Sequence, residues 1–137
     1  GVAALRHLVA QATRELPGFD VEICETHHNQ KVDAPSGTAK MLLDEVIGAE
    51  PECGYHAQYG REGMCGKRDP KEIGMHSLRG GTVAGVHTVS FFGVDEEVSL
   101  THRATSRQIF VNGALAAAQN IVKREAGFYT FDQVMFE

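Results

Sequence analysis

The sequence predicts an α+β fold in which a four-stranded mixed, mainly antiparallel sheet carries helices on one face. Two observations support this prediction. Segments with helical periodicity alternate with segments in which apolar and polar residues alternate. In addition, residues 82–105 are rich in β-branched and aromatic residues and contain a central Gly93-Val-Asp95 turn, which is typical of a long antiparallel hairpin. The expected order is helix, strand, helix, loop, three strands and helix.

The first three elements follow from local patterns. Apolar residues recur every three or four positions over residues 2–16, which predicts a helix that Pro17-Gly18 ends. Residues 19–27 alternate apolar and polar side chains and predict a strand. Ser36 is a good N-cap for a helix over residues 38–47.

The second half begins with a glycine-rich, polar stretch over residues 48–70, which predicts a long loop of the kind that is usually functional or mobile in a compact domain. Residues 73–78 predict a short strand before the hairpin, and the alanine-rich residues 112–124 predict a helix that Gly127 ends. We expect the hairpin to serve in oligomerisation, because two helices cannot cover all of its apolar side chains. These side chains are Val83, Val89, Phe91, Val98 and Leu100.

Composition limits the classes of function. The chain has 137 residues, 42% hydrophobic content and a formal net charge of −5, which predicts one soluble globular domain and argues against nucleic-acid binding. The sequence has no run of eighteen apolar residues, which a membrane span would need, and its start shows no signal-peptide pattern. The three cysteines have no CxxC spacing, which favours a reduced, cytoplasmic setting. The opening residues already show a helical pattern without an initiator methionine, so we expect a piece of a longer protein.

Residues 22–39 hold the side chains with the clearest chemical potential. His27 and His28 are adjacent at the end of a predicted strand, and histidine can donate or accept a proton near pH 7. Lys31 adds a positive charge. Ser36-Gly37-Thr38 opens a helix, where unpaired N–H groups can bind a carboxylate or phosphate. The alternatives are a structural histidine, a solvated lysine and a plain helix cap, each of which is common.

Other candidate sites are weaker. Glu25, His27, His28 and His56 could hold a metal, but no HxxxH or HExxH spacing occurs, and we expect no metal site. The three histidines of the predicted β segments are expected to be packing or interface residues. They are His76, His87 and His102. No GxGxxG or P-loop pattern occurs, so the chain shows no nucleotide-binding fold of its own.

Residues 22–39 resemble the signature of bacterial dihydrodipicolinate reductase: Glu-Ile-x-Glu-x-His, three residues, then Lys-x-Asp-x-Pro-Ser-Gly-Thr-Ala. Further stretches over nearly the whole chain are similar to this family. They are Arg61-Glu-Gly63, Gly85-Val-His87-Thr88, Thr101-His102-Arg103, Asn112-Gly-Ala-Leu and Gly127-Phe-Tyr129.

The resemblance implies an oxidoreductase of the diaminopimelate route to lysine, in which NADPH or NADH reduces a dihydrodipicolinate-type cyclic dicarboxylate to tetrahydrodipicolinate. Such enzymes have an N-terminal Rossmann-like nucleotide domain and a C-terminal substrate-binding and tetramerisation domain. Residues 1–137 resemble the second domain alone, and residues 108–137 resemble segments that pack on the first. The resemblance therefore implies a homotetramer whose isolated second domain is inactive. The alternative is a non-catalytic oligomerisation or anion-binding module.

The resemblance also implies residue roles. His27 corresponds to the catalytic acid/base and Lys31 to a second catalytic residue. Four further positions correspond to substrate ligands: His28, Ser36, Gly37 and Thr38. Arg107 and Phe110 correspond to positions near the nicotinamide cofactor.

Overall fold

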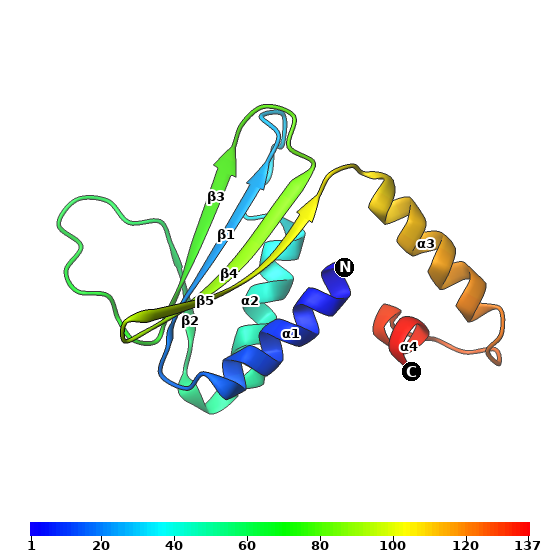
Figure 1. Ribbon diagram of the computed structural model, residues 1–137, viewed down its shortest axis with the longest axis horizontal. Helices are drawn as coiled ribbons and strands as arrows, with labels where there is room; N and C mark the ends of the chain where they lie inside the picture. Colours follow the sequence, from blue (N-terminus) through cyan, green and yellow to red (C-terminus); the bar gives the residue numbers. More distant parts are fainter. The chain divides into compact units, whose positions relative to one another are not determined.

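The computed structural model describes residues 1–137 as two units, residues 1–103 and 104–137. The first unit is built on a five-stranded mixed sheet with the strand order β2-β3-β1-β4-β5 (Figure 1). Its elements, in chain order, are α1 (Val2–Glu15), β1 (Asp20–His27), α2 (Gly37–Ala49), a 3₁₀ turn (Pro51–Cys53), β2 (His56–Tyr59), β3 (Glu72–Arg79), β4 (Gly85–Gly93) and β5 (Glu96–Ala104).

The α+β class is confirmed, but the prediction of four strands was wrong. The additional strand is β2, which lies inside the predicted loop and pairs in parallel with the first half of β3. A four-residue edge strand carries too few residues for a recognisable alternation, and it is held by its neighbour. Because β1 and β3 also pair in parallel, the sheet is more evenly mixed than predicted. Only β1–β4 and the β4–β5 hairpin have the expected antiparallel character.

The core lies between the inner face of the sheet and the helices α1 and α2. Ile23, Val89 and Phe91 point inward from the central strands, and Leu42 and Val46 meet them from α2. All five side chains are fully buried. Much of the apolar hairpin surface that was expected to need a second subunit is covered within this unit, because Val89 and Phe91 belong to the core, and Val98 and Leu100 pack against it.

The outer face of the sheet points away from α1 and α2, and hydroxyl groups predominate on the hairpin. Thr88 and Thr101 lie 2.9 Å apart through their Oγ1 atoms, and Ser90 and Ser99 lie 2.7 Å apart through their Oγ atoms. Phe92 is 39% exposed on the same face. The predicted use of this hairpin in oligomerisation therefore stays a prediction.

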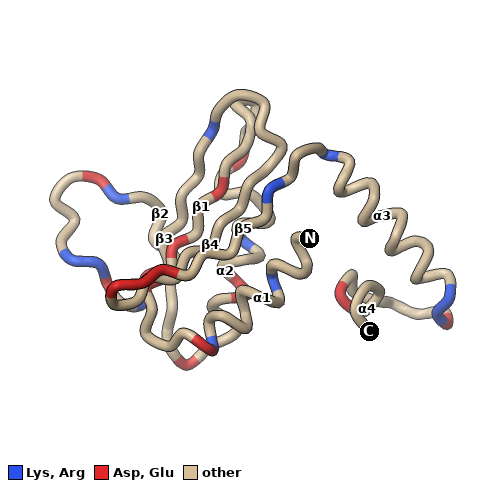
Figure 2. The backbone as a smooth tube through the Cα atoms, viewed as in Figure 1, with Lys and Arg blue, Asp and Glu red and all other residues tan.

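A network of ion pairs fastens the loop between β2 and β3 to the sheet. Basic positions of this loop are marked along the backbone in Figure 2. The Arg61 guanidinium donates to Glu22 at 2.7 Å and to Glu72 at 2.5 Å, and Arg68 donates to Glu22 at 3.1 Å. His76 Nε2 lies 2.6 Å from the remaining oxygen of Glu22. Burial alone would raise the pKa of Glu22, but these hydrogen bonds lower it to about 2.

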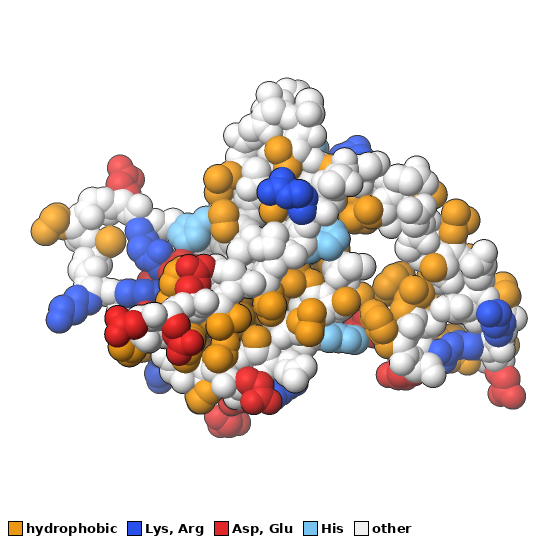
Figure 3. All heavy atoms as spheres, viewed as in Figure 1, with side chains coloured by type: hydrophobic (Ala, Val, Ile, Leu, Met, Phe, Trp, Pro, Cys, Tyr) orange, Lys and Arg blue, Asp and Glu red, His pale blue; other side chains and the backbone are white.

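The second unit contains α3 (Gln108–Ile121) and α4 (Phe131–Phe136). Thr130 caps α4 through a reciprocal capping box with Gln133, and Asn120 of α3 donates to the Val134 carbonyl at 3.3 Å. No residue of α3 is buried, and hydrophobic side chains lie on the surface of this unit (Figure 3). In neither unit is any helix both long enough and apolar enough to cross a lipid bilayer.

Candidate active site

The inner face of the sheet changes from apolar to polar at the C-terminal end of β1. In β1, the inward positions run Val21, Ile23 and then Glu25. Strand register places Glu25 opposite His87 of β4, and His27 opposite Arg79 of β3. Because strand side chains alternate between faces, these polar groups share the inner face and lie just beyond the hydrophobic core.

Glu25 is the centre of this polar cluster and is only 1% exposed. Arg79 donates to both of its carboxylate oxygens at 2.9 Å, and the Ser36 backbone N–H donates at 3.1 Å. His27 Nδ1 lies 2.5 Å from Oε2. Burial alone would raise the pKa of Glu25, but the hydrogen bonds from Arg79 and His27 lower it to about 2. Glu25 is therefore an anion at neutral pH.

The His27 ring is oriented by this carboxylate. An ionised carboxylate can only accept, so Nδ1 of His27 must carry the proton in this contact. The other ring nitrogen, Nε2, points past Gly85, where a Cβ atom would lie 3.1 Å from it. The ring is therefore held through Nδ1, and Nε2 has no hydrogen-bond partner within the protein.

His87 belongs to the same cluster, although the sequence analysis assigned it to packing or an interface. Its ring lies 5.2 Å from that of His27, edge to face, and its Nε2 lies 2.8 Å from the Ser36 hydroxyl. Burial, with a contribution from His27, lowers the pKa of His87 to about 4. His87 is consequently neutral at pH 7.

The start of α2 offers backbone donors beside this cluster. Ser36 caps the helix by accepting from the Ala39 N–H, as predicted, and it is only 3% exposed. Its N–H and hydroxyl are occupied by Glu25 and His87. The N–H groups of Gly37 and Thr38 have no partner within the helix, because they belong to its first turn. Gly37 is exposed, so an anion can approach these two groups.

His28 and Lys31 lie in the loop that joins β1 to α2. The His28 N–H donates to the Val83 carbonyl at 2.8 Å, and the Lys31 N–H donates to the His28 carbonyl at 3.2 Å. The Lys31 ammonium donates to Asp33 at 2.7 Å, which lowers the pKa of the Asp33 carboxyl. Asp33 is exposed, so a ligand carboxylate could replace it as the partner of Lys31.

Arg107 and Phe110 belong to the second unit. Arg107 precedes α3 and is exposed, and Phe110 in the first turn of α3 is 56% exposed. Their predicted place near a cofactor stays a prediction.

Comparison with known proteins identifies the family. A family model described as "Dihydrodipicolinate reductase, C-terminus" matches residues 1–135. The chain belongs to this family.

Relatives agree with the assignment. The chain is 47% identical over 134 residues to 4-hydroxy-tetrahydrodipicolinate reductase of Staphylococcus aureus strains JH9 and Newman, covering 98% of this chain and 55% of each relative. A solved structure described as dipicolinate-bound dihydrodipicolinate reductase from Paenisporosarcina sp. TG-14 superposes with a TM-score of 0.75 at 27% identity, covering 98% of this chain and 51% of that one. The chain thus spans about half the length of these reductases.

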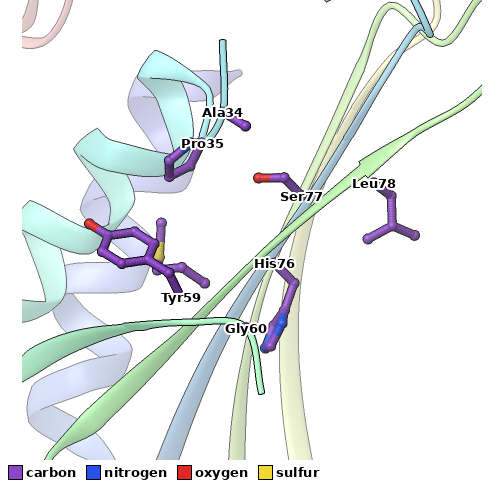
Figure 4. Close-up of a pocket in the computed structure, with 8 residues that line it drawn as sticks. Ala34, Pro35, Tyr59, Gly60, His76, Ser77 and Leu78 are labelled. Atoms are coloured by element: carbon purple, nitrogen blue, oxygen red, sulfur yellow. The ribbon is translucent and has the colours of Figure 1, made fainter. Parts of the chain in front are cut away.

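Within this dihydrodipicolinate reductase domain, one pocket lies apart from the side chains of His27 and Lys31. A pocket of about 470 Å³ lies where β2 stops beside β3, and it is bordered by Pro35, Tyr59 and Ser77 (Figure 4). The Ser77 side chain points toward Pro35 in this view, whereas Leu78 points away. The pocket is a feature of the sheet edge at the β2–β3 pair.

A metal ion at the cluster of Glu25, His27 and His87 would compete with hydrogen bonds that these side chains already make. Ligand atoms of Glu25, His27 and His87 lie within 4.8 Å of one another. Both oxygens of Glu25 accept from Arg79, and His87 is bonded to Ser36. The expected absence of a metal at this cluster stays a prediction.

Sequence reasoning missed Arg79 and His87, and it considered Glu25 only as a metal ligand. One signal was present, because Glu25 and His87 continue the alternation of buried positions in their strands. Their meeting depends on strand register, which no local pattern reveals.

Proposed function

We propose that this chain is the substrate-binding part of an NAD(P)H-dependent reductase that converts a dihydrodipicolinate-type cyclic dicarboxylate to tetrahydrodipicolinate in lysine and diaminopimelate biosynthesis. The observation that carries the proposal is the placement of His27, with Nδ1 held by Glu25 and Nε2 uncommitted, beside the open start of α2. Family membership favours this function over that of a non-catalytic oligomerisation or anion-binding module.

His27 is proposed to donate the proton that completes the reduction. Hydride addition to a conjugated imine leaves an enamine, which must be protonated on carbon. A positioned acid accelerates such a step by about 10²- to 10⁴-fold. The proton leaves Nε2, because Nδ1 donates to Glu25. Lys31 would offset negative charge on the substrate once its ammonium leaves Asp33 for a substrate carboxylate.

The second carboxylate of the substrate is proposed to bind at the start of α2. The N–H groups of Gly37 and Thr38 and the Thr38 hydroxyl supply donors there, and the helix dipole favours an anion. Ser36 stabilises the conformation of this turn, because its backbone N–H and its hydroxyl are hydrogen-bonded inside the protein. His28 is the remaining proposed ligand from the preceding loop.

Bound NADPH or NADH would supply the hydride. We propose that the dinucleotide binds mainly outside these residues, because they show no glycine-rich phosphate loop between a strand and a helix. We therefore assign the nucleotide to the rest of the polypeptide, with Arg107 and Phe110 approaching the nicotinamide. The exposed apolar side chains of α3 support packing of residues 108–137 on that part. Micromolar affinity of this chain alone for NADPH in calorimetry would contradict this division.

We further propose that the protein is a cytoplasmic homotetramer in which the outer face of the sheet joins subunits. The exposed hydroxyl-bearing surface of the hairpin and the 39% exposure of Phe92 support the interface, and three free cysteines suit a reduced compartment. Light scattering at tens of micromolar should give a tetramer. A monomer at that concentration would contradict this assembly.

The test of the substrate site is an NMR titration of this chain with pyridine-2,6-dicarboxylate, following the amides of residues 27–39. We expect the Gly37 and Thr38 amides to shift, with millimolar or weaker affinity, because one open site supplies only a few kcal/mol. If these amides stay unchanged while others shift, α2 has only a structural cap and the substrate binds elsewhere.

A further inference from the structure

Glu25 connects three separate segments of the chain through one buried carboxylate. It accepts from His27 on its own strand, from Arg79 on β3 and from the Ser36 N–H at the start of α2. Its side chain is 1% exposed, so no solvent competes for these bonds. A buried carboxylate with this many donors has a single well-defined position.

Arg79 extends the connection to the loop that carries Lys31. Its guanidinium donates to both oxygens of Glu25 and, through Nη2, to the Asp33 carbonyl at 2.9 Å. A bidentate pair of this kind fixes orientation as well as distance. The β1–α2 loop is thereby tied to the same carboxylate that contacts the His27 ring.

We propose that Glu25 is a positioning residue. It selects the Nδ1–H tautomer of His27 and fixes the position of the ring relative to the Ser36–Thr38 turn. The inference rests on the proposed function, in which His27 donates the proton and the turn binds the substrate. Glu25 itself touches neither the substrate nor the reacting atoms in this scheme.

The proposal accounts for the direction of proton transfer. In the charged ring both nitrogens carry protons, and the Nδ1–H donates to Glu25. The Nε2–H bond breaks as the carbon–hydrogen bond of the product forms. The ring is left neutral with its proton still on Nδ1, and Nε2 is ready to be protonated again. Without Glu25 nothing holds the proton on Nδ1, so the neutral ring is free to carry it on Nε2, and Nε2 is then not available to take up the next proton.

The direct test is nitrogen-15 NMR of the imidazole rings of this chain above the histidine titration range, with His27→Gln used for assignment. We expect wild-type His27 to be almost entirely the Nδ1–H tautomer. In Glu25→Gln we expect a mixture or the Nε2–H tautomer. Wild-type His27 in the Nε2–H form would overturn the proposal, whether or not any Glu25 variant folds.

Glu22→Gln is the matched control. Glu22 lies on the same strand and is also ion-paired, but it faces the outer side of the sheet with Arg61 and His76. Its replacement should leave the His27 ring signals unchanged. If both variants disturb His27 equally, the effect is general loosening of β1, and the proposal fails.

Kinetics of the complete reductase supply a second readout. Glu25→Gln should lower kcat by about 10- to 100-fold, part of what a positioned acid contributes, while the KM for the dicarboxylate changes less than about threefold. Glu25→Asp keeps the charge and should recover part of kcat. An unchanged kcat in Glu25→Gln would overturn the proposal. Failure of the wild-type chain to bind pyridine-2,6-dicarboxylate at residues 27–39 would instead contradict the proposed function and leave the tautomer result standing.

Discussion

The hydroxyl of Ser36 lies 2.8 Å from Nε2 of His87, and both side chains are buried. This contact joins the cap of α2 to the central strand β4 across 51 residues of sequence. It places a neutral histidine against the ring of His27, and it removes the Ser36 hydroxyl from the surface of the site.

Because His87 is buried as a neutral ring, the free energy of unfolding should fall as the pH becomes mildly acidic. The unfolded chain takes up a proton at the ordinary histidine value of 6.5, whereas burial holds the folded pKa at about 4. The unfolded state therefore binds more protons between these values, and stability is lost as pH falls from 6.5 toward 4. The loss should approach about 3 kcal/mol, since one pKa unit corresponds to about 1.4 kcal/mol.

Urea unfolding at several pH values measures this loss of stability. A His87→Gln variant should show a flatter profile over this range, and an equally steep one would assign the effect to other groups.

The complete reductase should lose turnover when His27 is replaced. His27→Gln removes a proton donor used in the transition state, so kcat should fall by about 10²- to 10⁴-fold with little change in KM. Lys31→Ala should lower kcat and raise KM, because it removes the positive charge that is proposed to offset a carboxylate of the bound substrate. Steady-state kinetics measure kcat and KM of each variant, with Lys67→Ala as the control. An unaltered kcat in His27→Gln would move the acid role to Lys31 or water.

Space beside the His27 ring should be essential. A Cβ atom at position 85 would lie 3.1 Å from His27 Nε2, and Gly85 has a φ of +157°, so Gly85→Ala should both crowd the ring and strain the strand, and lower kcat about tenfold or more. Gly80→Ala is a control for an added carbon on a neighbouring turn, because nothing lies within 4 Å of that carbon and the Gly80 N–H bond to the His27 carbonyl is retained. Equal activities for the two variants would show that the ring tolerates the crowding.

The anion site can be probed by a substitution that the protein itself tolerates. Nothing lies within 4 Å of a Cβ atom added at Gly37, so Gly37→Ala should fold normally. The added methyl group should hinder a carboxylate at the start of α2 and weaken pyridine-2,6-dicarboxylate binding at least tenfold. Gly48→Ala in the same helix should bind normally and gain about 0.5–1 kcal/mol of stability. Undiminished binding by Gly37→Ala would place the dicarboxylate elsewhere.

The loop between β2 and β3 should depend on Arg61, which bridges Glu22 and Glu72. Arg61→Met should lower the free energy of unfolding by about 1 kcal/mol, as for other partly exposed ion pairs, and increase hydrogen exchange within the loop. Lys67→Met in the same loop should change stability by less than about 0.5 kcal/mol. Similar losses in both variants would mean that the network adds nothing specific.

The sequence by itself determined what is local. The cap at Ser36, the alternation that aims Glu25 and His27 inward, and the grouping of His27, Lys31 and Gly37 all follow from spacing within residues 22–39. The family resemblance also lay in this stretch and is confirmed by the family match over residues 1–135. Hydrogen-bonding patterns over a few residues need no knowledge of the rest of the chain.

Only the tertiary structure decided which distant groups complete the site. Arg79 reaches Glu25 across 54 residues, and His87 reaches Ser36 across 51. The edge strand β2 likewise exists through its pairing with β3. A shift of one residue in strand register would turn every one of these side chains to the opposite face. Register is set by the burial of the whole sheet against α1 and α2, and no segment of the sequence carries that information alone.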